Sequence, residues 1–412
     1  MNESDMDMKA DIPAATDRRE STGLMEPMLV PDGSPHRPRL TDLAVELASL
    51  SAGFRRSLPE GVLTALSVLV RAMNCYYSNL IEGHDTHPID IERAMKNDYS
   101  AEPEKRNLQL EAKAHITVQQ WIDEDGGLHG REFTQSGICE IHRRFGELLP
   151  EELLWVEEPD TKERIKLVPG ALRDRDVKVG RHIPISSGAL PRFLKRFEEV
   201  YGRLGKAGTI LAAAAAHHRL LWIHPFLDGN GRVARLMSHA TLLEALDTGG
   251  VWSIARGLAR NVAAYKGHLA DCDLERRNDL DGRGHLSEEA LASFTQFFLE
   301  TCLDQVTFME GLVQPDRLRV RILLWVEEEI RIDALPAKAG SVLEAVLYRG
   351  YLPRGEVGDV LGTSGRHARR VVSALTDRGV LTSESPRSPL HITFPAKLAS
   401  RWMPGLFPER TV

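Results

Sequence analysis

Twelve consecutive residues, HPFLDGNGRVAR from His224 to Arg235, constrain this chain more than any other stretch. They follow an alanine-rich helical run that Pro225 must end, because proline lacks an amide hydrogen and crowds the preceding turn. The Gly-Asn-Gly at 229–231 can adopt positive φ at little cost, so that successive N–H groups can converge on one anion. A helix beginning near Gly231 would point its free amides and positive dipole at the same place.

The charged residues of this stretch also favour a phosphate ligand. Arg232 and Arg235 lie three apart on one helical face, where each cation opposes the helix dipole by roughly 0.3–1 kcal/mol. A bound polyphosphate would compensate both of them. Asp228 offers a hard oxygen ligand for Mg²⁺, and His224 is a candidate general base near neutral pH. The alternative, a glycine-rich helix–loop–helix with a core histidine, does not explain this combination. The Walker and G-x-G-x-x-G phosphate motifs are absent.

The stretch resembles the Fic motif, H-x-F-x-[DE]-G-N-[GK]-R-x-x-R, at every defined position. The resemblance extends over about residues 40–310 and includes PGALRDRDVKVG, which is similar to the family's substrate-docking flap. It implies a protein adenylyltransferase that uses ATP and Mg²⁺ to transfer AMP to a Ser, Thr or Tyr hydroxyl of a target protein, with pyrophosphate leaving. The target itself cannot be deduced from the sequence.

The resemblance also implies a role for each residue of the motif. His224 would deprotonate the target hydroxyl, and Asp228 would hold Mg²⁺ on the α- and β-phosphates. The remaining residues would form the nucleotide site: Phe226 as the anchor in the core, Gly229, Asn230 and Gly231 as the phosphate cradle (Asn230 partly through its side chain), and Arg232 and Arg235 as ligands of the β- and γ-phosphates.

A second motif lies about 140 residues upstream, at SNLIEG from Ser78 to Gly83. It resembles the family's inhibitory motif [ST]-x-x-x-E-[GN], with Ser78, Glu82 and Gly83 at the defined positions. A carboxylate held against Arg235 would form a charge-assisted pair and occupy the arginine that must receive the γ-phosphate. The alternative is a helix end with a solvated glutamate and a C′ glycine.

The candidate target-docking flap is the short β-branched stretch Val177, Lys178 and Val179. In the family the flap pairs with a target segment by strand addition, whereas the alternative here is an ordinary surface hairpin. Tyr265 resembles a tyrosine near the adenine in relatives, but a buried aromatic is the simpler interpretation.

The hydrophobic periodicity predicts a mainly α fold. The resemblance implies that this fold is a Fic helical bundle with a small β-hairpin flap, and the order of elements after it resembles a C-terminal winged helix-turn-helix. The length of the chain, 412 residues, favours two or three domains. We expect a disordered tail at 1–36, a helical region with the inhibitory helix at 37–110, the catalytic core at 111–312 and the winged-helix-like domain at 313–412.

Composition excludes several other classes of protein. A net charge of -7 argues against a protein that coats nucleic acid through bulk electrostatics. Four scattered cysteines make zinc sites and a disulfide framework unlikely and fit a cytoplasmic setting. The first 20 residues lack the apolar run of a signal peptide, and no stretch approaches ~20 uninterrupted apolar residues, so we expect no membrane contact.

The C-terminal module is predicted to contain helices at 340–348, 354–361 and 364–378, then a hairpin over LTSESPRSPLHITF. This order resembles a winged helix-turn-helix. Arg366, Arg369 and Arg370 lie near the start of the third helix, where a recognition helix contacts DNA. Winged helices also serve in dimerisation and target docking, so a DNA partner stays open.

Two rival functions stay open beside the adenylyltransferase. The first is a DNA-binding regulator whose Fic core senses nucleotide. The second uses the same site in reverse, with Glu82 positioning water to remove AMP from a modified protein. Self-modification and a homodimer are also compatible with the sequence.

Overall fold

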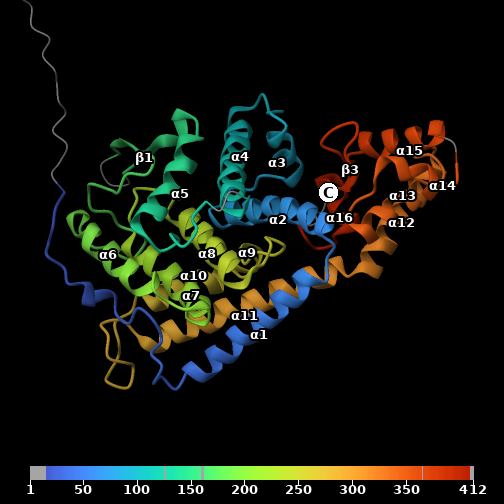
Figure 1. Cartoon of the computed structure of the whole chain (residues 1–412). Coiled ribbons are helices and arrows are strands. Elements are labelled where there is room, and N and C mark those ends of the chain that lie inside the picture. Colours follow the sequence, from blue (N-terminus) through green and yellow to red (C-terminus); the bar gives the residue numbers. More distant parts are fainter. Residues whose placement is uncertain (1–14, 125–126, 159–161, 364, 409–412) are drawn as a thin grey trace, which may run out of the picture.

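The computed structural model describes residues 15–124, 127–158, 162–363 and 365–408, and within them the fold is mainly α, as predicted (Figure 1). The helices and strands follow one another in this order: η1 (Thr22–Met25), α1 (Arg37–Arg56), α2 (Glu60–Ile81), α3 (Pro88–Met95), α4 (Pro103–Glu124), α5 (Gln135–Glu147), η2 (Glu151–Leu154), β1 (Trp155–Glu157), β2 (Arg164–Lys166), η3 (Ser187–Ala189), α6 (Leu190–Tyr201), α7 (Lys206–Ile223), α8 (Asn230–Leu246), α9 (Ala255–Arg260), α10 (Val262–Cys272), α11 (Glu288–Val313), α12 (Pro315–Arg331), α13 (Ala339–Arg349), η4 (Arg354–Glu356), α14 (Val357–Leu361), α15 (Gly365–Asp377), β3 (Leu381–Thr382), β4 (His391–Ile392), η5 (Ala396–Leu398) and α16 (Ala399–Trp402).

The helices α7 and α8 form the centre of the fold. The alanine run 212–216 of α7 is completely or almost completely buried, because small side chains allow neighbouring helices to approach closely. The long helices α1 and α11 pack side by side along one edge of the molecule (Figure 1). The loop between α7 and α8, which carries the twelve-residue motif, therefore joins two of the most deeply buried helices.

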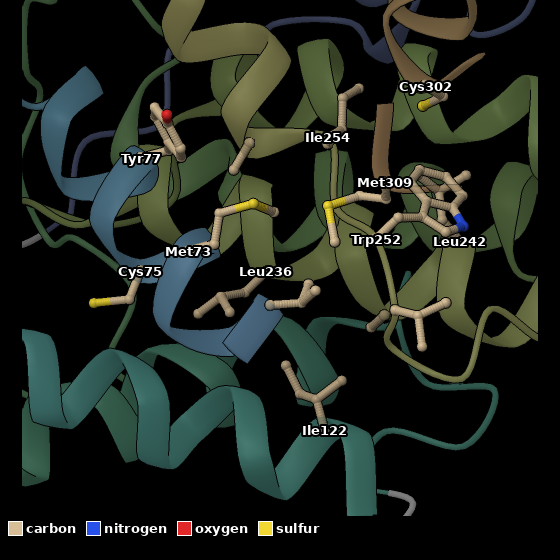
Figure 2. Close-up of a cluster of buried hydrophobic side chains, with 14 of the residues drawn as sticks. Met73, Cys75, Tyr77, Ile122, Leu236, Leu242, Trp252, Ile254, Cys302 and Met309 are labelled. Carbon is tan, nitrogen blue, oxygen red and sulfur yellow. The ribbon is translucent and has the colours of Figure 1, made fainter. Parts of the chain in front are cut away.

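The helices α4 and α5 pack on α8, and α2 packs on α4 and α9. Figure 2 shows side chains of four helices meeting in one core: Met73 of α2, Ile122 of α4, Leu236 of α8 and Met309 of α11, all nearly or fully buried. Burying the apolar surface of these side chains stabilises the fold by roughly 25 cal/mol for each Å² removed from water. The helix α4 runs without interruption across residue 110, where we had expected the boundary of the catalytic core.

The segment 15–36 differs from the expected disordered tail. It is ordered and lies against α6 and α7, where the side chain of Asp17 pairs with Arg192 at 2.8 Å and Glu26 pairs with Arg196 at 2.6 Å. The hydroxyl of Tyr201 donates to the main-chain oxygen of Met28 at 2.6 Å. Polar residues that seemed solvated are thus matched to arginines far along the chain. Residues 1–14 lie outside the described part.

Strand structure is sparse, in keeping with the expected small hairpin. Strands β1 and β2 pair antiparallel with Val156 opposite Ile165. The flap stretch forms no strand of its own: Val179 and His182 make only an isolated antiparallel bridge, with N···O distances of 2.9 and 3.0 Å.

The C-terminal module contains α13, α14, α15 and the β3–β4 hairpin, close to the predicted bounds; Ser364, the expected first residue of the third helix, is not described. The chain after α16 docks on α2. The hydroxyl of Tyr77 donates to the main-chain oxygen of Leu406 at 2.9 Å, and the rings of Tyr76 and Phe407 meet edge to face. The module therefore contacts α2, the helix at whose end the SNLIEG motif lies (Figure 1).

The part of the chain that is described contains no helix long and apolar enough to cross a membrane.

Candidate active site

The loop begins where α7 ends. His224 adopts the left-handed conformation (φ 51°, ψ 64°), and its amide donates to the main-chain oxygen of Leu220 at 3.0 Å. A left-handed residue at this position ends a helix and reverses the chain direction, although it is uncommon for a residue with a side chain. Pro225 follows and prevents another turn. His224 is therefore fixed at the end of a buried helix and is only partly buried itself.

The side chain of Asn230 closes the loop. Its Oδ1 accepts from the amide of Phe226 at 3.0 Å, and its Nδ2 donates to the oxygen of the same residue at 2.9 Å. The ring of Phe226 is fully buried and stacks on His142, with centroids 3.9 Å apart. Phe226 thus lies in the core, as predicted. The side chain of Asn230, however, holds the loop in shape rather than facing an open phosphate site.

The N-terminus of α8 forms an anion cradle. Gly229 precedes the helix with φ 81°, and no described side chain caps the first amide groups. A Cβ placed on Gly231 would lie 2.5 Å from Oε1 of Glu82, so the carboxylate approaches the first turn closely. An anion at a helix N-terminus is favoured by the free amides and the dipole. Here the chain supplies that anion itself.

The donors of Arg235 bond to Ser78 of α2 and to Glu82, which directly follows that helix. Its Nε donates to the hydroxyl of Ser78 at 2.8 Å, and its NH2 donates to the main-chain oxygen of Ser78 at 3.2 Å and pairs with Oε1 of Glu82. Burial alone would raise the pKa of Glu82, but the charges of Arg235 and Arg232 and the hydrogen bond outweigh it and lower the pKa. Gly83 follows with φ 89°, which allows the chain to turn away at once. The structure thus brings Ser78 and Glu82 of the upstream motif to Arg235.

Arg232 lies on the other side of the cradle. Its NH1 pairs with Oε1 of Glu111 on α4 at 2.6 Å, and its guanidinium lies 5.0 Å from the ring centroid of Phe145. Its NH2 is 3.7 Å from Oδ2 of Asp228. The two arginines therefore face the same turn of α8 and have different partners.

His224 is held by the base of the flap. Arg173 donates from Nε to the main-chain oxygen of His224 at 2.8 Å and from its amide to that of Pro225 at 2.9 Å. Burial, followed by the nearby charge of Arg173, lowers the pKa of His224 to about 4. The imidazole is therefore neutral at pH 7, the state that a general base requires.

Asp228 is the residue that could hold a metal ion. Its side chain is 59% exposed beside the cradle, and no group of three or more metal-ligating side chains occurs among the described residues. One carboxylate combined with phosphate oxygens and water is the usual environment of Mg²⁺ on a nucleotide. This donor set fits a Mg²⁺ ion that arrives with phosphates, and it does not fit a resident metal.

The flap stretch lies beside the loop through Arg173. The main chains of Val177 and Lys178 make no hydrogen bond to any described residue, and Val179 is 40% exposed. Unpaired main-chain groups in an extended segment can accept another strand. This segment forms no strand by itself, and its unpaired main-chain groups are compatible with the docking of a target segment.

Three contributors to the site escaped the sequence analysis: Arg173, His142 and Glu111. Arg173 lies in the quoted flap run, where its charge gave no sign that it would be 3% exposed. Glu111 and His142 belong to helices in which the spacing of polar residues is typical of an exposed face, so their burial was not predicted. Tyr265 is buried, as expected, and its hydroxyl lies 2.7 Å from Nε2 of His217.

Comparison with known proteins agrees with this geometry. Residues 132–242 match the Fic/DOC family model. A relative called protein adenylyltransferase Fic, from Nematostella vectensis, is 30% identical over 197 residues, which are 46% of this chain and 42% of the relative. One of the same name from Drosophila erecta is 35% identical over 117 residues, which are 28% of this chain and 20% of the relative. The chain thus spans less than half the length of these relatives.

One solved structure has a similar fold over most of its length. A Fic family protein from Desulfovibrio desulfuricans aligns with a TM-score of 0.50 and 16% identity, covering 87% of this chain and 96% of its own. The sequence motif, the geometry of the loop, the family match and the shared fold lead to one conclusion: this chain contains a Fic domain, matched over residues 132–242.

Proposed function

We propose that this chain is a protein adenylyltransferase that Glu82 holds inactive. The observation that carries the proposal is the position of the Glu82 carboxylate, which lies at the amide-lined start of α8 and pairs with Arg235. Because the Glu82 carboxylate of the chain itself occupies this place, a phosphate of a bound nucleotide could bind to the same amides and the same arginine. The matched relatives named protein adenylyltransferase support the same reaction class.

In this proposal ATP lies with its phosphates across the first turn of α8. The neutral His224 takes the proton from a Ser, Thr or Tyr hydroxyl of the target. The freed oxygen attacks the α-phosphorus and forms a new P–O bond while the bond to the bridging oxygen of the β-phosphate breaks. AMP remains on the target, and pyrophosphate leaves. Arg232 and Arg235 stabilise the charge that develops on the β- and γ-phosphates.

Asp228 would hold Mg²⁺ on the nucleotide, where the ion would neutralise phosphate charge. The exposed carboxylate beside the cradle supports this assignment. The flap around Val177, Lys178 and Val179 would pair with an extended target segment, because its free main-chain groups recognise backbone rather than sequence. A cytoplasmic protein substrate and modification of the chain itself both fit this arrangement.

Autoinhibition follows from competition for one arginine. A phosphate cannot reach the Nε and NH2 donors of Arg235 while they are bound to Ser78 and Glu82. Replacing Glu82 by Gly removes the competing anion but leaves the hydroxyl of Ser78 in place. Activity should then depend only on the catalytic loop.

Incubation with labelled ATP and Mg²⁺ tests the proposal. We expect Glu82→Gly to incorporate at least ten times more label into itself or into lysate proteins than the wild type, and the added change His224→Ala to abolish it. Mass spectrometry of the labelled peptides would identify the target. Equal incorporation by wild type and Glu82→Gly would contradict autoinhibition, and no incorporation by either would contradict the reaction.

A second function, DNA binding by the C-terminal module, is favoured by its charge. Between residues 339 and 408 there are nine Lys or Arg against five Asp or Glu, in a chain of net charge -7. Arg366, Arg369 and Arg370 are exposed near the start of α15, and none pairs with a carboxylate of the described residues. The order α13–α14–α15–hairpin supports a winged helix-turn-helix with α15 as its recognition helix.

Fluorescence anisotropy of the full chain with a random duplex, at two salt concentrations, tests this second function. We expect binding that weakens as salt rises, and that weakens strongly when Arg366, Arg369 and Arg370 are replaced together by Gln. Unchanged binding by this variant, or no binding at low salt, would exclude α15 as the DNA contact. A module that instead docks protein partners would give the second of these results.

A further inference from the structure

Glu111 stands out because it is a buried carboxylate that contacts the nucleotide loop from outside the Fic motif. It lies on α4, is 4% exposed, and its two oxygens have different partners. Oε1 accepts from NH1 of Arg232 at 2.6 Å, and Oε2 lies 2.9 Å from Nδ1 of His84, two residues after Glu82. Hydrogen bonding to Glu111 raises the pKa of His84 although burial opposes this effect.

The helix that carries Glu111 is fixed against α8 at further points. Gln119 lies 3.3 Å from Nε2 of His239, and Asp123 pairs with the same nitrogen at 2.7 Å. Glu111 and Gln119 are eight residues apart and so lie on one face of α4. Glu111 is therefore presented to Arg232 by a rigid element.

The two arginines of the loop differ in which of their N–H donors are already bonded. The Nε and NH2 groups of Arg235 bond to Ser78 and Glu82 at the C-terminal end of α2. Arg232 donates to Glu111 through NH1 alone. Its buried Nε has no hydrogen-bond partner among the described residues, and its NH2 lies 3.7 Å from Asp228, on the side of the cradle.

We propose that Glu111 is a positioning residue, which together with the ring of Phe145 holds Arg232 so that its unused donors face the phosphate cradle. A guanidinium carries five N–H donors in a rigid plane, so one edge can stay on Glu111 while another binds a phosphate oxygen. Glu82 must separate from Arg235 before nucleotide binds, whereas Glu111 stays paired with Arg232 when nucleotide is bound. Glu82 therefore opposes nucleotide binding, and Glu111 supports it.

The opposite arrangement would make Glu111 a second inhibitory carboxylate. Its charge does reduce the attraction of the site for phosphate. However, an Arg232 that moved to a phosphate would leave Glu111 buried with only His84, a half-exposed imidazole, as partner. NH2 of Arg232, which lies on the side of Asp228 and is not bonded to Glu111, makes that movement unnecessary.

The test deepens the proposed function and rests on it, because it takes Arg232 as the ligand of the β-phosphate. In the Glu82→Gly background, Mg·ADP and AMP are titrated calorimetrically into Glu111→Ala, Glu111→Asp and Glu111→Gln. We expect Glu111→Ala to bind ADP at least tenfold more weakly, as for the loss of a charge-assisted contact, with AMP affinity changed less than twofold because AMP has no β-phosphate. Glu111→Gln keeps an acceptor for Arg232 and should stay within about threefold of its parent.

Glu124→Gln is the matched control, because it removes a 2.6 Å ion pair with Arg71 from the far end of the same helix. It should leave both affinities unchanged. If Glu111→Ala fails to fold, Glu111→Asp carries the test, since the shorter side chain should weaken ADP binding and spare AMP. ADP binding by Glu111→Ala as tight as the parent or tighter would overturn the proposal. Failure of the Glu82→Gly parent to bind ADP or ATP would instead contradict the proposed function.

Discussion

The carboxylate of Glu82 and the guanidinium of Arg235 form an ion pair over the first turn of α8, 153 residues apart in the chain. The pair lies where the unbonded amides of the helix point, so the carboxylate is next to both the helix N-terminus and an arginine, two groups that favour an anion. Glu82 is the C-cap residue of α2, and Arg235 lies five residues after the first residue of α8, Asn230. Any change that shifts α2 relative to α8 therefore alters access to the cradle.

Gly231→Ala should report on this contact through stability. The new Cβ would lie 2.5 Å from Oε1 of Glu82 and 3.1 Å from NH1 of Arg235, so the pair must shift. We expect a loss of roughly 1–3 kcal/mol in the free energy of unfolding in the wild type. In Glu82→Gly the contact with the carboxylate is absent and only the flexible tip of Arg235 remains near the new Cβ, so alanine in the helix should be neutral or stabilising by about 0.5–1 kcal/mol. Denaturant unfolding of the four proteins of the cycle measures the difference. Equal costs in both backgrounds would show that Glu82 does not lie against Gly231 in solution.

The pH dependence of the reaction should reflect the burial of His224. Its pKa is lowered to about 4, so the neutral base is fully present from pH 8 down to about pH 5 and is lost as the pH falls through 4. The value of kcat/KM reports the free enzyme, and in Glu82→Gly it should stay flat between pH 5.5 and 7. An ordinary histidine would lose most of its activity over that range. An acid limb with a midpoint between pH 6 and 7 would mean that His224 is solvated or is not the base.

Gly61→Ala should disturb the docking of the C-terminal module on α2. The added Cβ would lie 1.8 Å from the main-chain oxygen of Gly350, which cannot move as a flexible side chain would. We expect the free energy of unfolding to fall by roughly 1–3 kcal/mol, together with a lower Tm. Gly53→Ala in α1 is the control, because no atom lies within 4 Å of its Cβ and the change should stabilise by about 0.5–1 kcal/mol. Similar effects of the two substitutions would show that the module does not press on α2.

The sequence predicted the active loop well because the relevant information is local. Pro225 ends a helix, glycines permit the turn, and the spacing of Arg232 and Arg235 fixes their common face. Glu82 was predicted to reach Arg235 only through the resemblance of its motif, because no local rule brings residues so far apart together. The ends of the helices α13, α14 and α15 were predicted within one residue, since turn glycines such as Gly350 and Gly362 follow them, whereas α14 begins three residues later than predicted, after the 3-10 turn η4.

Tertiary pairing explains what the sequence did not predict. Asp17 and Glu26 looked like solvated charges until Arg192 and Arg196 provided partners. Glu111 lies on a helix whose charges suggested an exposed face, and its burial depends on Arg232 lying opposite. The side chain of Asn230 was assigned to phosphate, yet both its polar atoms serve the loop. In each case the partner of the side chain lies outside the short stretch of sequence from which its role was predicted.

Calorimetric titration of Mg·ATP into the wild type, Glu82→Gly and Glu82→Gly with Arg235→Ala tests the central claim most directly. If Glu82 occupies the site of a phosphate, Glu82→Gly should bind ATP at least tenfold more tightly than the wild type, and the added loss of Arg235 should reverse most of that gain. The same affinity in the wild type and in Glu82→Gly would contradict the claim that this carboxylate blocks the cradle.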